Sequence, residues 1–210
     1  MRKTLIAALL STPLLALAVP TPQAIHPTNL VVNGSFETTP TALGSGAWTI
    51  YSGLQGWTVT AGNGVEVRNN AAGTAAHGNK FVELDTTINS TIAQGFASLS
   101  AGSEYLLRFQ YSPRIGVSSA SNAIAAYWNG VQIASVTATG GNAHAWNEYS
   151  FNVRAVTGVN TLSFAGAGNN DSVGGSLDNV QLNAIPEPAT LGLALAGVAG
   201  VLVMRRRRQA

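Results

Sequence analysis

Two carboxylates, Glu83 and Asp85, stand two residues apart in a stretch that alternates apolar and polar side chains. In a β-strand they would share one face with about 6–7 Å between them, which is near the separation used in glycoside cleavage. Catalytic carboxylates must flank the scissile bond from different directions, however, and neighbours on one strand do this poorly. We therefore expect both side chains to contact solvent or a ligand, in a protein that is not an enzyme and has no catalytic residues.

Aromatic and polar residues on strand faces and at strand ends are candidates for ligand binding. Aromatic rings stack on the C–H-rich faces of sugars, while neighbouring polar groups hold hydroxyls. The alternative for any one aromatic residue is packing in the core or at its rim, as we expect for Trp57. The predicted ligand-binding residues lie on strand faces or in loops: Trp48, Tyr51, Glu83, Asp85, Arg108, Gln110, Arg114 and Trp128.

Other kinds of chemistry find little support. The histidines, His26, His77 and His144, lack the spacing of zinc ligands, and the absence of cysteine rules out disulfides and thiol chemistry. Between residues 19 and 185, five basic and eight acidic side chains give a formal charge of −3. A mildly acidic domain with scattered basic residues has no footprint for nucleic acid, so we expect no such partner.

Short alternating segments separated by turn residues indicate that these candidates are positioned by β-strands. We expect strands over 30–36, 56–59, 64–68, 81–85, 105–111, 123–128, 131–136, 146–153, 160–165 and 176–182. Asn129 and Gly130 form a favoured hairpin turn pair between two of them. Evenly spaced strands without helical periodicity predict an all-β fold, a two-sheet antiparallel jelly-roll sandwich.

Both ends of the chain are set apart by composition. Arg2 and Lys3 precede an apolar stretch, and an A-x-A pattern predicts a signal peptide over 1–18, with an alternative end at 24. The sandwich domain then covers 25–183 and the tail 184–210. In the tail we expect a membrane helix over 189–204, which is short for a bilayer core. The basic residues after it favour the cytoplasmic side; they are Arg205, Arg206, Arg207 and Arg208.

Pro186, Glu187 and Pro188 stand immediately before this apolar segment. The order of a Pro-Glu-Pro breaker, one apolar segment and a basic end resembles the PEP-CTERM signal of Gram-negative bacteria. A membrane protease called exosortase recognises and cuts that signal. The resemblance implies an exosortase-type protease as a partner, an inner-membrane stage before processing, and then the cell surface or extracellular matrix as the location.

A second resemblance covers residues 29–183. It rests on N-G-S-F-E at 33–37, L-Q-G-W at 54–57, G-V-E-V at 64–67, G-N-K-F-V-E-L-D at 78–85 and L-D-N-V-Q-L at 177–182. Their order is similar to that of the galactose-binding-like jelly rolls, which include carbohydrate-binding modules of xylanases and cell-wall-associated domains of plants and bacteria. The resemblance implies the same fold and a polysaccharide partner.

A structural calcium joins the two ends of the fold in many of these relatives. Carried over by position, its ligands are Glu37 and Asp178. Strand alternation places Asp178 on the same side as Val180 and Leu182, facing the core, where a carboxylate is costly unless it is neutralised. The alternative is a bulge that turns Asp178 to solvent.

Together these features predict an exported, exosortase-sorted envelope or extracellular protein that binds polysaccharide without catalysis or serves as a matrix component. The association of PEP-CTERM systems with exopolysaccharide implies that the polymer is the cell's own. A protein-binding adhesin or scaffold without a sugar site is the first alternative, and an exposed apolar patch or sheet edge would distinguish it. A glycoside hydrolase, with two carboxylates facing one cleft, is the second.

Overall fold

The computed structural model describes residues 28–185, which form two antiparallel six-stranded sheets. The first sheet has the order β1 (Trp48–Tyr51), β4 (Val65–Asn69), β5 (Lys80–Glu83), β12 (Ser176–Ala184), β7 (Glu104–Ser112), β10 (Asn147–Arg154). The second has the order β2 (Gly53–Leu54), β3 (Trp57–Ala61), β6 (Thr91–Phe96), β11 (Asn160–Gly166), β8 (Ile124–Trp128), β9 (Val131–Val136). The predicted all-β, two-sheet sandwich is confirmed.

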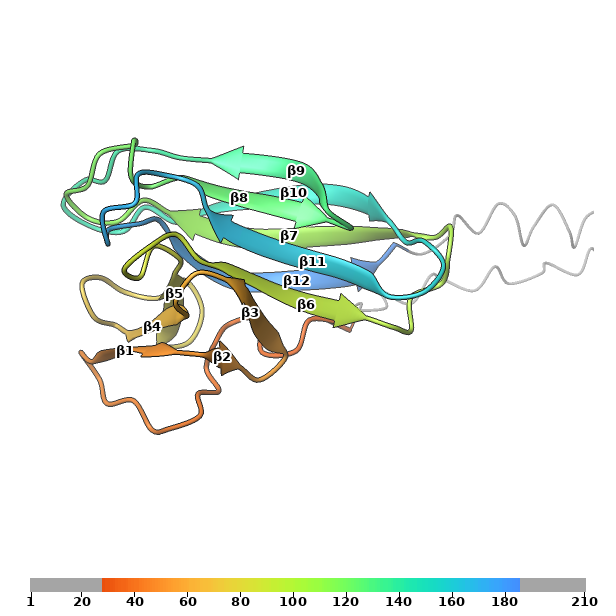
Figure 1. Cartoon of the computed structure of the whole chain (residues 1–210), viewed down its shortest axis with the longest axis horizontal. Coiled ribbons are helices and arrows are strands. Elements are labelled where there is room, and N and C mark those ends of the chain that lie inside the picture. The colour runs from red at the N-terminus through yellow and green to blue at the C-terminus, as the bar shows by residue number, and fades with distance from the viewer. Residues whose placement is uncertain (1–27, 186–210) are drawn as a thin grey trace, which may run out of the picture.

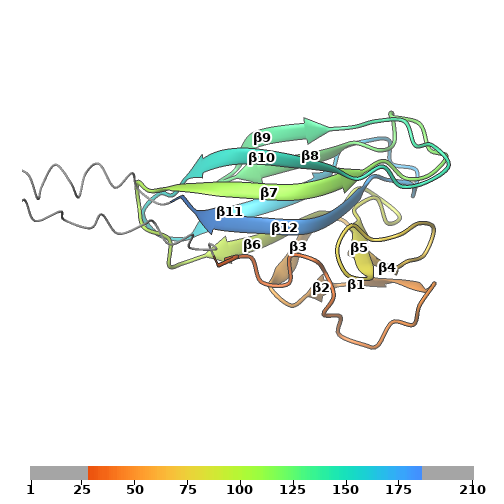
Figure 2. The same cartoon turned by 180° about the vertical axis from the view of Figure 1, so that it is seen from behind.

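The sheets stack face to face, and Figures 1 and 2 view them from opposite sides. β7 shows how the sequence directs this packing, because Tyr105, Leu107 and Phe109 are buried while Leu106 and Arg108, between them, are half-exposed. Across the core, the ring of Phe109 meets that of Phe164 from β11 edge to face, at 5.1 Å between centroids. Period-two alternation thus gives each strand one apolar face, and the two apolar faces close on each other.

The segment 30–36 is the clearest departure from the expected strands, because it forms a turn rather than a strand. Asn33 and Phe36 both have positive φ, 54° and 57°, which no extended strand permits. The segment lies against β12, where Leu30 N donates to Leu182 O and Val180 N donates to Gly34 O, both at 2.8 Å. We expected residues 30–36 to form a strand from their alternating pattern. Their backbone groups instead form hydrogen bonds with β12 from within a turn.

Alternation also misplaced Asp178. The register of β12 against β7 shifts between Asp178 and Gln181, and Asn179 within this bulge has φ of 49°. As a result Leu177, and not Asp178, joins Val180 in the core. Asp178 is fully buried all the same, so neither the core-facing orientation nor the solvent-facing alternative holds.

Three strands were not expected from the sequence, namely β1, β2 and β6. β1 and β2 are edge strands, and β1 has the half-exposed pattern of an edge. β6 carries Gln94 at a buried position, which breaks the apolar alternation. Its amide is used to hold the turn segment, because Val32 N donates to Gln94 Oε1 at 2.7 Å and Gln94 Nε2 donates to Val32 O at 3.0 Å.

The β5–β6, β7–β8, β9–β10 and β11–β12 loops gather at one end of the sandwich (Figure 1). The predicted signal peptide, Pro-Glu-Pro motif, membrane helix and basic tail lie outside the described residues. Within residues 28–185 we find no helix of the length and hydrophobicity needed to cross a bilayer.

Candidate functional site

A polar pocket of about 410 Å³ opens at this loop end, between the outer face of the first sheet and four loops. Its lining residues come from the chain before β1, from β1 and β4, and from the β4–β5, β5–β6, β7–β8 and β11–β12 connections: Gly46, Trp48, Glu66, Arg68, Ala71, Ala72, Thr86, Arg114 and Ser172. Strands provide the floor of the pocket, and loops far apart in sequence provide its walls.

The floor follows from strand alternation and register. Val65 and Val67 of β4 are buried in the core, so Glu66 and Arg68 point to the opposite face. On that face the strand register places Arg68 beside Trp48 of β1, and Glu66 beside Glu83 of β5. Directly opposite residues of paired strands have Cβ atoms about 5 Å apart, so these pairs contact each other.

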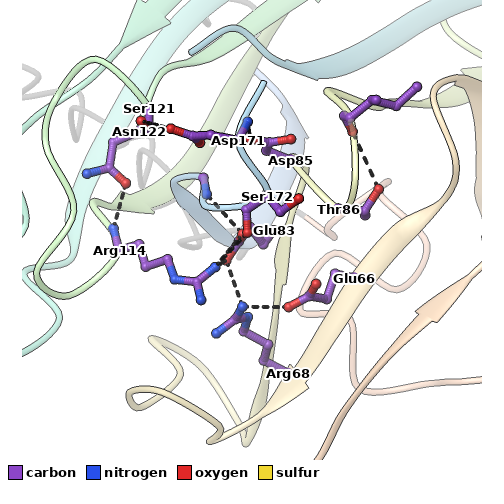
Figure 3. Close-up of polar contacts among 12 residues, drawn as sticks. Glu66, Arg68, Glu83, Asp85, Thr86, Arg114, Ser121, Asn122, Asp171 and Ser172 are labelled. Atoms are coloured by element: carbon purple, nitrogen blue, oxygen red, sulfur yellow. Dashed lines mark hydrogen bonds and ion pairs between the residues drawn. The ribbon is translucent and has the colours of Figure 1, made fainter. Parts of the chain in front are cut away.

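The charges on the floor form one network (Figure 3). Arg68 Nη2 lies 2.6 Å from Glu66 Oε1 and 3.1 Å from Glu83 Oε2. Arg114 reaches in from the β7–β8 loop, with Nη1 2.8 Å from Glu83 Oε1 and 3.0 Å from Oε2. Gly174 N also donates to Glu83 Oε1 at 2.9 Å. Two guanidinium groups therefore neutralise two carboxylates beneath the pocket.

Burial raises the pKa of Glu83 to about 7, although Arg68 and Arg114 act to lower it; Glu66 adds to the rise and the Gly174 N–H opposes it. Desolvation outweighs the two cations because the Glu83 side chain has no exposed surface. Arg68 Nε is likewise buried, and it has no hydrogen-bond partner among the residues that the structure describes. An N–H group left unpaired beside a pocket is suited to donate to an oxygen atom of a ligand.

Trp48 provides the apolar wall of the pocket. Its side chain lies on edge strand β1 and the residue is 56% exposed, although tryptophan usually buries most of its area. An exposed aromatic face beside paired charges and an unpaired donor is an arrangement that can stack on a ring and hold its hydroxyls.

The structure brings three of the predicted ligand-binding residues, Trp48, Glu83 and Arg114, into this site. Asp85 is buried directly behind it. The site also includes Glu66 and Arg68, which the prediction had not chosen. Their side chains alternate with two valines in the sequence, and this signal could have identified them.

The other four predicted residues lie elsewhere. Tyr51 and Trp128 belong to the core cluster, where Trp128 Nε1 donates to Arg154 O at 2.8 Å and the Tyr51 hydroxyl bonds to Thr41. Arg108 and Gln110 are half-exposed on the outer face of β7 and do not line the pocket. The core placement of Tyr51 and Trp128 corrects their prediction as ligand-binding residues, because a buried ring offers no face to a ligand from solvent.

The β4–β5 loop folds over the outer face of the first sheet and buries Asp178. Asp178 Oδ2 accepts hydrogen bonds from Ala76 N and His77 N at 2.8 Å each, and Oδ1 accepts one from Asn179 N at 2.6 Å. Burial raises the pKa of Asp178 to about 7, against the effect of the three N–H donors, and the charge of Glu37 raises it further.

Glu37 is held by the same loop. Its Oε1 accepts from Asn79 N at 2.8 Å and from Lys80 N at 2.7 Å, while Lys80 Nζ donates to the main-chain oxygen of Glu37 at 2.8 Å. Calcium is bound by oxygen atoms, whereas N–H groups and an ammonium group meet the carboxylates of Glu37 and Asp178. This donor set does not fit a calcium ion at these oxygens, so calcium there stays a prediction from the resemblance alone.

Two rings from the β9–β10 side anchor the loop. His144 Nδ1 and Trp146 Nε1 both bond to Thr74 O at 2.9 Å, and both rings meet Phe81 edge to face. Burial lowers the pKa of His144, and Arg68 lowers it further, although the contact with Thr74 O acts in the opposite direction. The β4–β5 loop thus forms a hydrogen-bonded cover over the part of the first sheet that lies next to the floor of the pocket.

Comparison with curated proteins finds relatives that are much longer. The chain is 33% identical over 175 residues to the multifunctional-autoprocessing repeats-in-toxin of Vibrio cholerae serotype O1, and 33% identical over 172 residues to the protein of that name from Vibrio vulnificus. The matches cover 80% and 77% of this chain but 4% and 3% of the relatives. The chain thus spans a small fraction of the length of the curated relatives it matches.

Among solved structures, the fold is similar to that of TmCBM61 in complex with β-1,4-galactotriose. The TM-score is 0.50 at 21% identity, covering 75% of this chain and 99% of that one. A family 35 carbohydrate binding module from Clostridium thermocellum gives a TM-score of 0.40 at 17% identity, covering 70% and 99% of the two chains. At 21% identity the first likeness shows the fold alone, which is the two-sheet jelly-roll sandwich expected from the sequence.

Two segments match protein-family descriptions. Residues 29–183 match the protein of unknown function DUF642, and residues 184–208 match the PEP-CTERM protein-sorting motif. The first match covers the whole sandwich, and the second begins where β12 ends. The chain therefore belongs to the DUF642 family and carries a PEP-CTERM sorting motif behind its two-sheet β-sandwich domain.

Proposed function

We propose that this protein is exported, sorted by an exosortase-type protease, and binds polysaccharide without catalysis in the pocket beside Trp48. The observation that carries the proposal is the exposed Trp48 ring beside a floor of paired charges. Sugars need an aromatic face for their C–H surface and directed polar groups for their hydroxyls. The pocket volume of about 410 Å³ falls within the usual range of small-molecule sites, about 300–1,000 Å³.

Arg68 and Arg114 give the site its polar specificity in this proposal. Each guanidinium uses part of its donor set on Glu83, which fixes its plane and leaves other N–H groups for a ligand. Within residues 28–185, Arg68 Nε is a buried donor without a hydrogen-bond partner. A sugar hydroxyl that accepts a hydrogen bond from this N–H group would satisfy a buried polar atom. A ligand with an oxygen atom at that position would therefore bind with higher affinity.

Catalysis is disfavoured by the same contacts. A carboxyl group with a pKa of about 7 would suit a general acid. Both oxygens of Glu83, however, are bound by arginine, and the side chain is fully buried beneath the pocket. Glu66 lies beside Glu83 on the neighbouring strand and not across a cleft from it, so the two cannot flank a glycosidic bond.

The sorting motif gives the proposed setting. In this reading the inner membrane holds the chain until exosortase cuts it, and the domain then binds polymer at the cell surface or in the matrix. The cell's own exopolysaccharide is the polymer we infer, because sorting to the surface brings the domain to it.

A glycan array probed with the full chain in detergent tests this proposal. We expect selective binding that is lost in Trp48→Ala and kept in Tyr127→Ala, because Tyr127 is a half-exposed aromatic residue of β8 outside the pocket. Binding that disappears equally in both variants, or a blank array with protein of unchanged melting temperature, would exclude the pocket as a polysaccharide site.

A protein-binding scaffold is the second candidate, favoured by an exposed apolar side chain on a sheet edge. Val131 lies on the edge strand β9 and is 67% exposed. An exposed apolar side chain on a sheet edge favours contact with another protein. Cross-linking of the full chain in detergent tests this: Val131→Asp should reduce dimer formation if this edge mediates self-association.

A further inference from the structure

The sandwich has a second end, opposite the polar pocket. The β6–β7 loop, the β10–β11 loop and the end of β12 lie there, as both views show (Figures 1 and 2). Backbone bonds join the two loops, because Gly102 N donates to Ala155 O at 2.8 Å and Ala155 N donates to Ser103 O at 3.0 Å. Ile185 N donates to Glu104 O at 3.3 Å. The last described residue is therefore held beside the first residue of β7, at this end of the fold.

A largely apolar groove of about 410 Å³ opens between these segments. Its lining comes from the turn segment 30–36, the end of β6, the β6–β7 loop, the start of β7 and the end of β12, and it includes Leu30, Val32, Phe96, Leu99 and Ala184. Leu30 and Val32 are 37% and 47% exposed, although both are large apolar side chains. The groove is therefore an apolar surface open to the outside.

The β10–β11 loop extends this surface, because Val156 and Val159 are 51% and 63% exposed. Val159 lies against the groove, since a Cβ atom added to Gly95 would be 3.2 Å from Val159 Cγ1 and Gly95 lines the groove. The loop is fixed by Asn160, whose Oδ1 accepts from Val156 N at 2.8 Å and whose Nδ2 donates to Val156 O at 3.0 Å. We define the tail-side surface by the exposed or half-exposed apolar residues of this end: Leu30, Val32, Leu99, Val156 and Val159.

The segments that carry the tail-side surface contain no charged residue. Residues 28–36, 97–103 and 155–159 have neither an acid nor a base. Glu104 and Arg154 flank the two loops and lie opposite each other in paired strands, so their formal charges cancel. Exposed apolar residues mark contact with a protein or with a membrane. Without a cluster of basic residues, such contact would not depend on anionic lipid.

The position of the tail favours a membrane as the partner. The sequence predicts a membrane helix that begins at residue 189, four residues after Ile185. Four residues of fully extended chain span at most about 14 Å, and the polar layer on each side of the hydrocarbon core is about 5–8 Å thick. While the tail is in the membrane, the tail-side surface is therefore within reach of the headgroup layer.

We propose that the tail-side surface docks the domain on the lipid bilayer before the tail is removed, with Val156 and Val159 in the headgroup layer. The inference rests on the membrane stage of the proposed function and not on its polysaccharide site. Apolar side chains that enter this layer leave water, while the two loops keep the backbone hydrogen bonds that join them. In the docked domain the pocket beside Trp48, at the opposite end, faces away from the membrane and stays open to polymer.

Fluorescence quenching of the full chain in phosphatidylcholine vesicles tests the docking. The chain has no cysteine, so Val159→Cys takes a single environment-sensitive dye. Lipids that carry a nitroxide on the headgroup should quench this dye by about half or more, since a docked apolar face lies about 5–10 Å into the headgroup boundary. The matched control is Ile88→Cys, an exposed apolar position in the β5–β6 loop at the other end, which should lose little emission.

A variant tests whether the apolar side chains cause the docking. Val156→Asp in the Val159→Cys background should lower the quenching, because a carboxylate opposes entry into the bilayer, whereas Ile88→Asp should leave it unchanged. Added salt and anionic lipid should have little effect, because the segments of this surface carry no charge. The comparison of the two labelled positions decides the question even if Val156→Asp does not fold.

Equal quenching at positions 88 and 159 would overturn the proposal. A dye at position 159 that reports an apolar environment but is not quenched by the nitroxide lipid would also overturn it, because protein, either a second copy or the tail, would then cover the surface. A chain that fails to float with the vesicles would refute the membrane stage and the docking together. Failure of the glycan array is a separate result, because docking is measured without polysaccharide.

Discussion

Arg114 Nη1 lies within 3.0 Å of both carboxylate oxygens of Glu83, so one guanidinium nitrogen from the β7–β8 loop contacts both oxygens of a fully buried acid on β5. The contact joins the wall of the pocket to its floor. Glu83 retains Arg68 and the Gly174 N–H as its other partners. Substitution of Arg114 should therefore lower the free energy of unfolding and also change the shape of the pocket.

Arg114→Met should lower the free energy of unfolding by about 3 kcal/mol, because it leaves a buried carboxylate short of one partner. Urea denaturation measures the change. The control is Arg108→Met, a half-exposed arginine on β7 outside the pocket, which should cost about 0.5 kcal/mol or less. In the Glu83→Gln background the cost of Arg114→Met should shrink, and strict additivity of the two substitutions would disprove this coupling.

Trp48→Ala should weaken polysaccharide binding by at least about thirtyfold, about 2 kcal/mol, because a central aromatic contact typically contributes this much. Trp48→Phe should retain part of the affinity, since it keeps an aromatic face. The melting temperature should hardly change, because the side chain is mostly exposed. Affinity electrophoresis in gels containing the bound polymer measures the effect. Equal affinities for the Ala and Phe variants would argue against stacking.

His144 should make stability fall on acidification. Burial lowers its pKa in the folded protein below the ordinary value of 6.5, so the unfolded chain binds the proton more readily. The stability contributed by the neutral ring is complete above about pH 6.5 and is lost as pH falls through the lowered pKa. Denaturation curves of wild type and His144→Asn should therefore converge between pH 8 and pH 5. Parallel dependence on pH in the two proteins would contradict the prediction.

Gly34→Ala should be strongly destabilising, by about 3 kcal/mol or more, because its Cβ atom would lie 2.0 Å from the main-chain oxygen of Val180. The turn segment must then move away from β12. Gly44→Ala is the matched control, since a Cβ atom there meets nothing within 4 Å. Thermal unfolding should leave Gly44→Ala within about 0.5 kcal/mol of wild type. Similar losses in the two variants would show that close approach is not the cause.

The sorting motif predicts removal of the tail during maturation. Protein extracted from the cell surface should have an intact mass that lacks residues 191–208, because cleavage is expected near Pro186. Deletion of the host exosortase should restore the full mass and leave the chain with the inner membrane. Surface protein that retains Arg205 to Arg208 in the wild-type host would rule out this processing.

Local patterns correctly predicted much of the sheet framework. Alternation in 105–111 identified β7 and its buried face, because strand periodicity depends only on neighbouring residues. Asn129 and Gly130 both adopt positive φ, 51° and 79°, as the hairpin between β8 and β9 requires. The sorting motif was equally visible, since its order and spacing are read along one segment.

The site depended on contacts between distant segments. No local pattern could say that Arg68 and Arg114 would share Glu83 as a partner, because strand order and loop packing bring the three residues together. Trp128 was misjudged for the same reason, since its burial is decided by Phe96 and Arg154 on other strands.

The sequence by itself determined the all-β class, the alternation of buried and exposed side chains along the strands, the hairpin turn and the sorting motif in the tail. Each of these rests on residues close together in the chain. Tertiary structure alone decided that 30–36 is a turn, that a bulge moves Asp178 out of the core, and that Trp48 stands exposed over a network of buried charges. These features depend on which distant backbones pair and which loops cover a sheet face, and such long-range contacts leave no periodic signal in the chain.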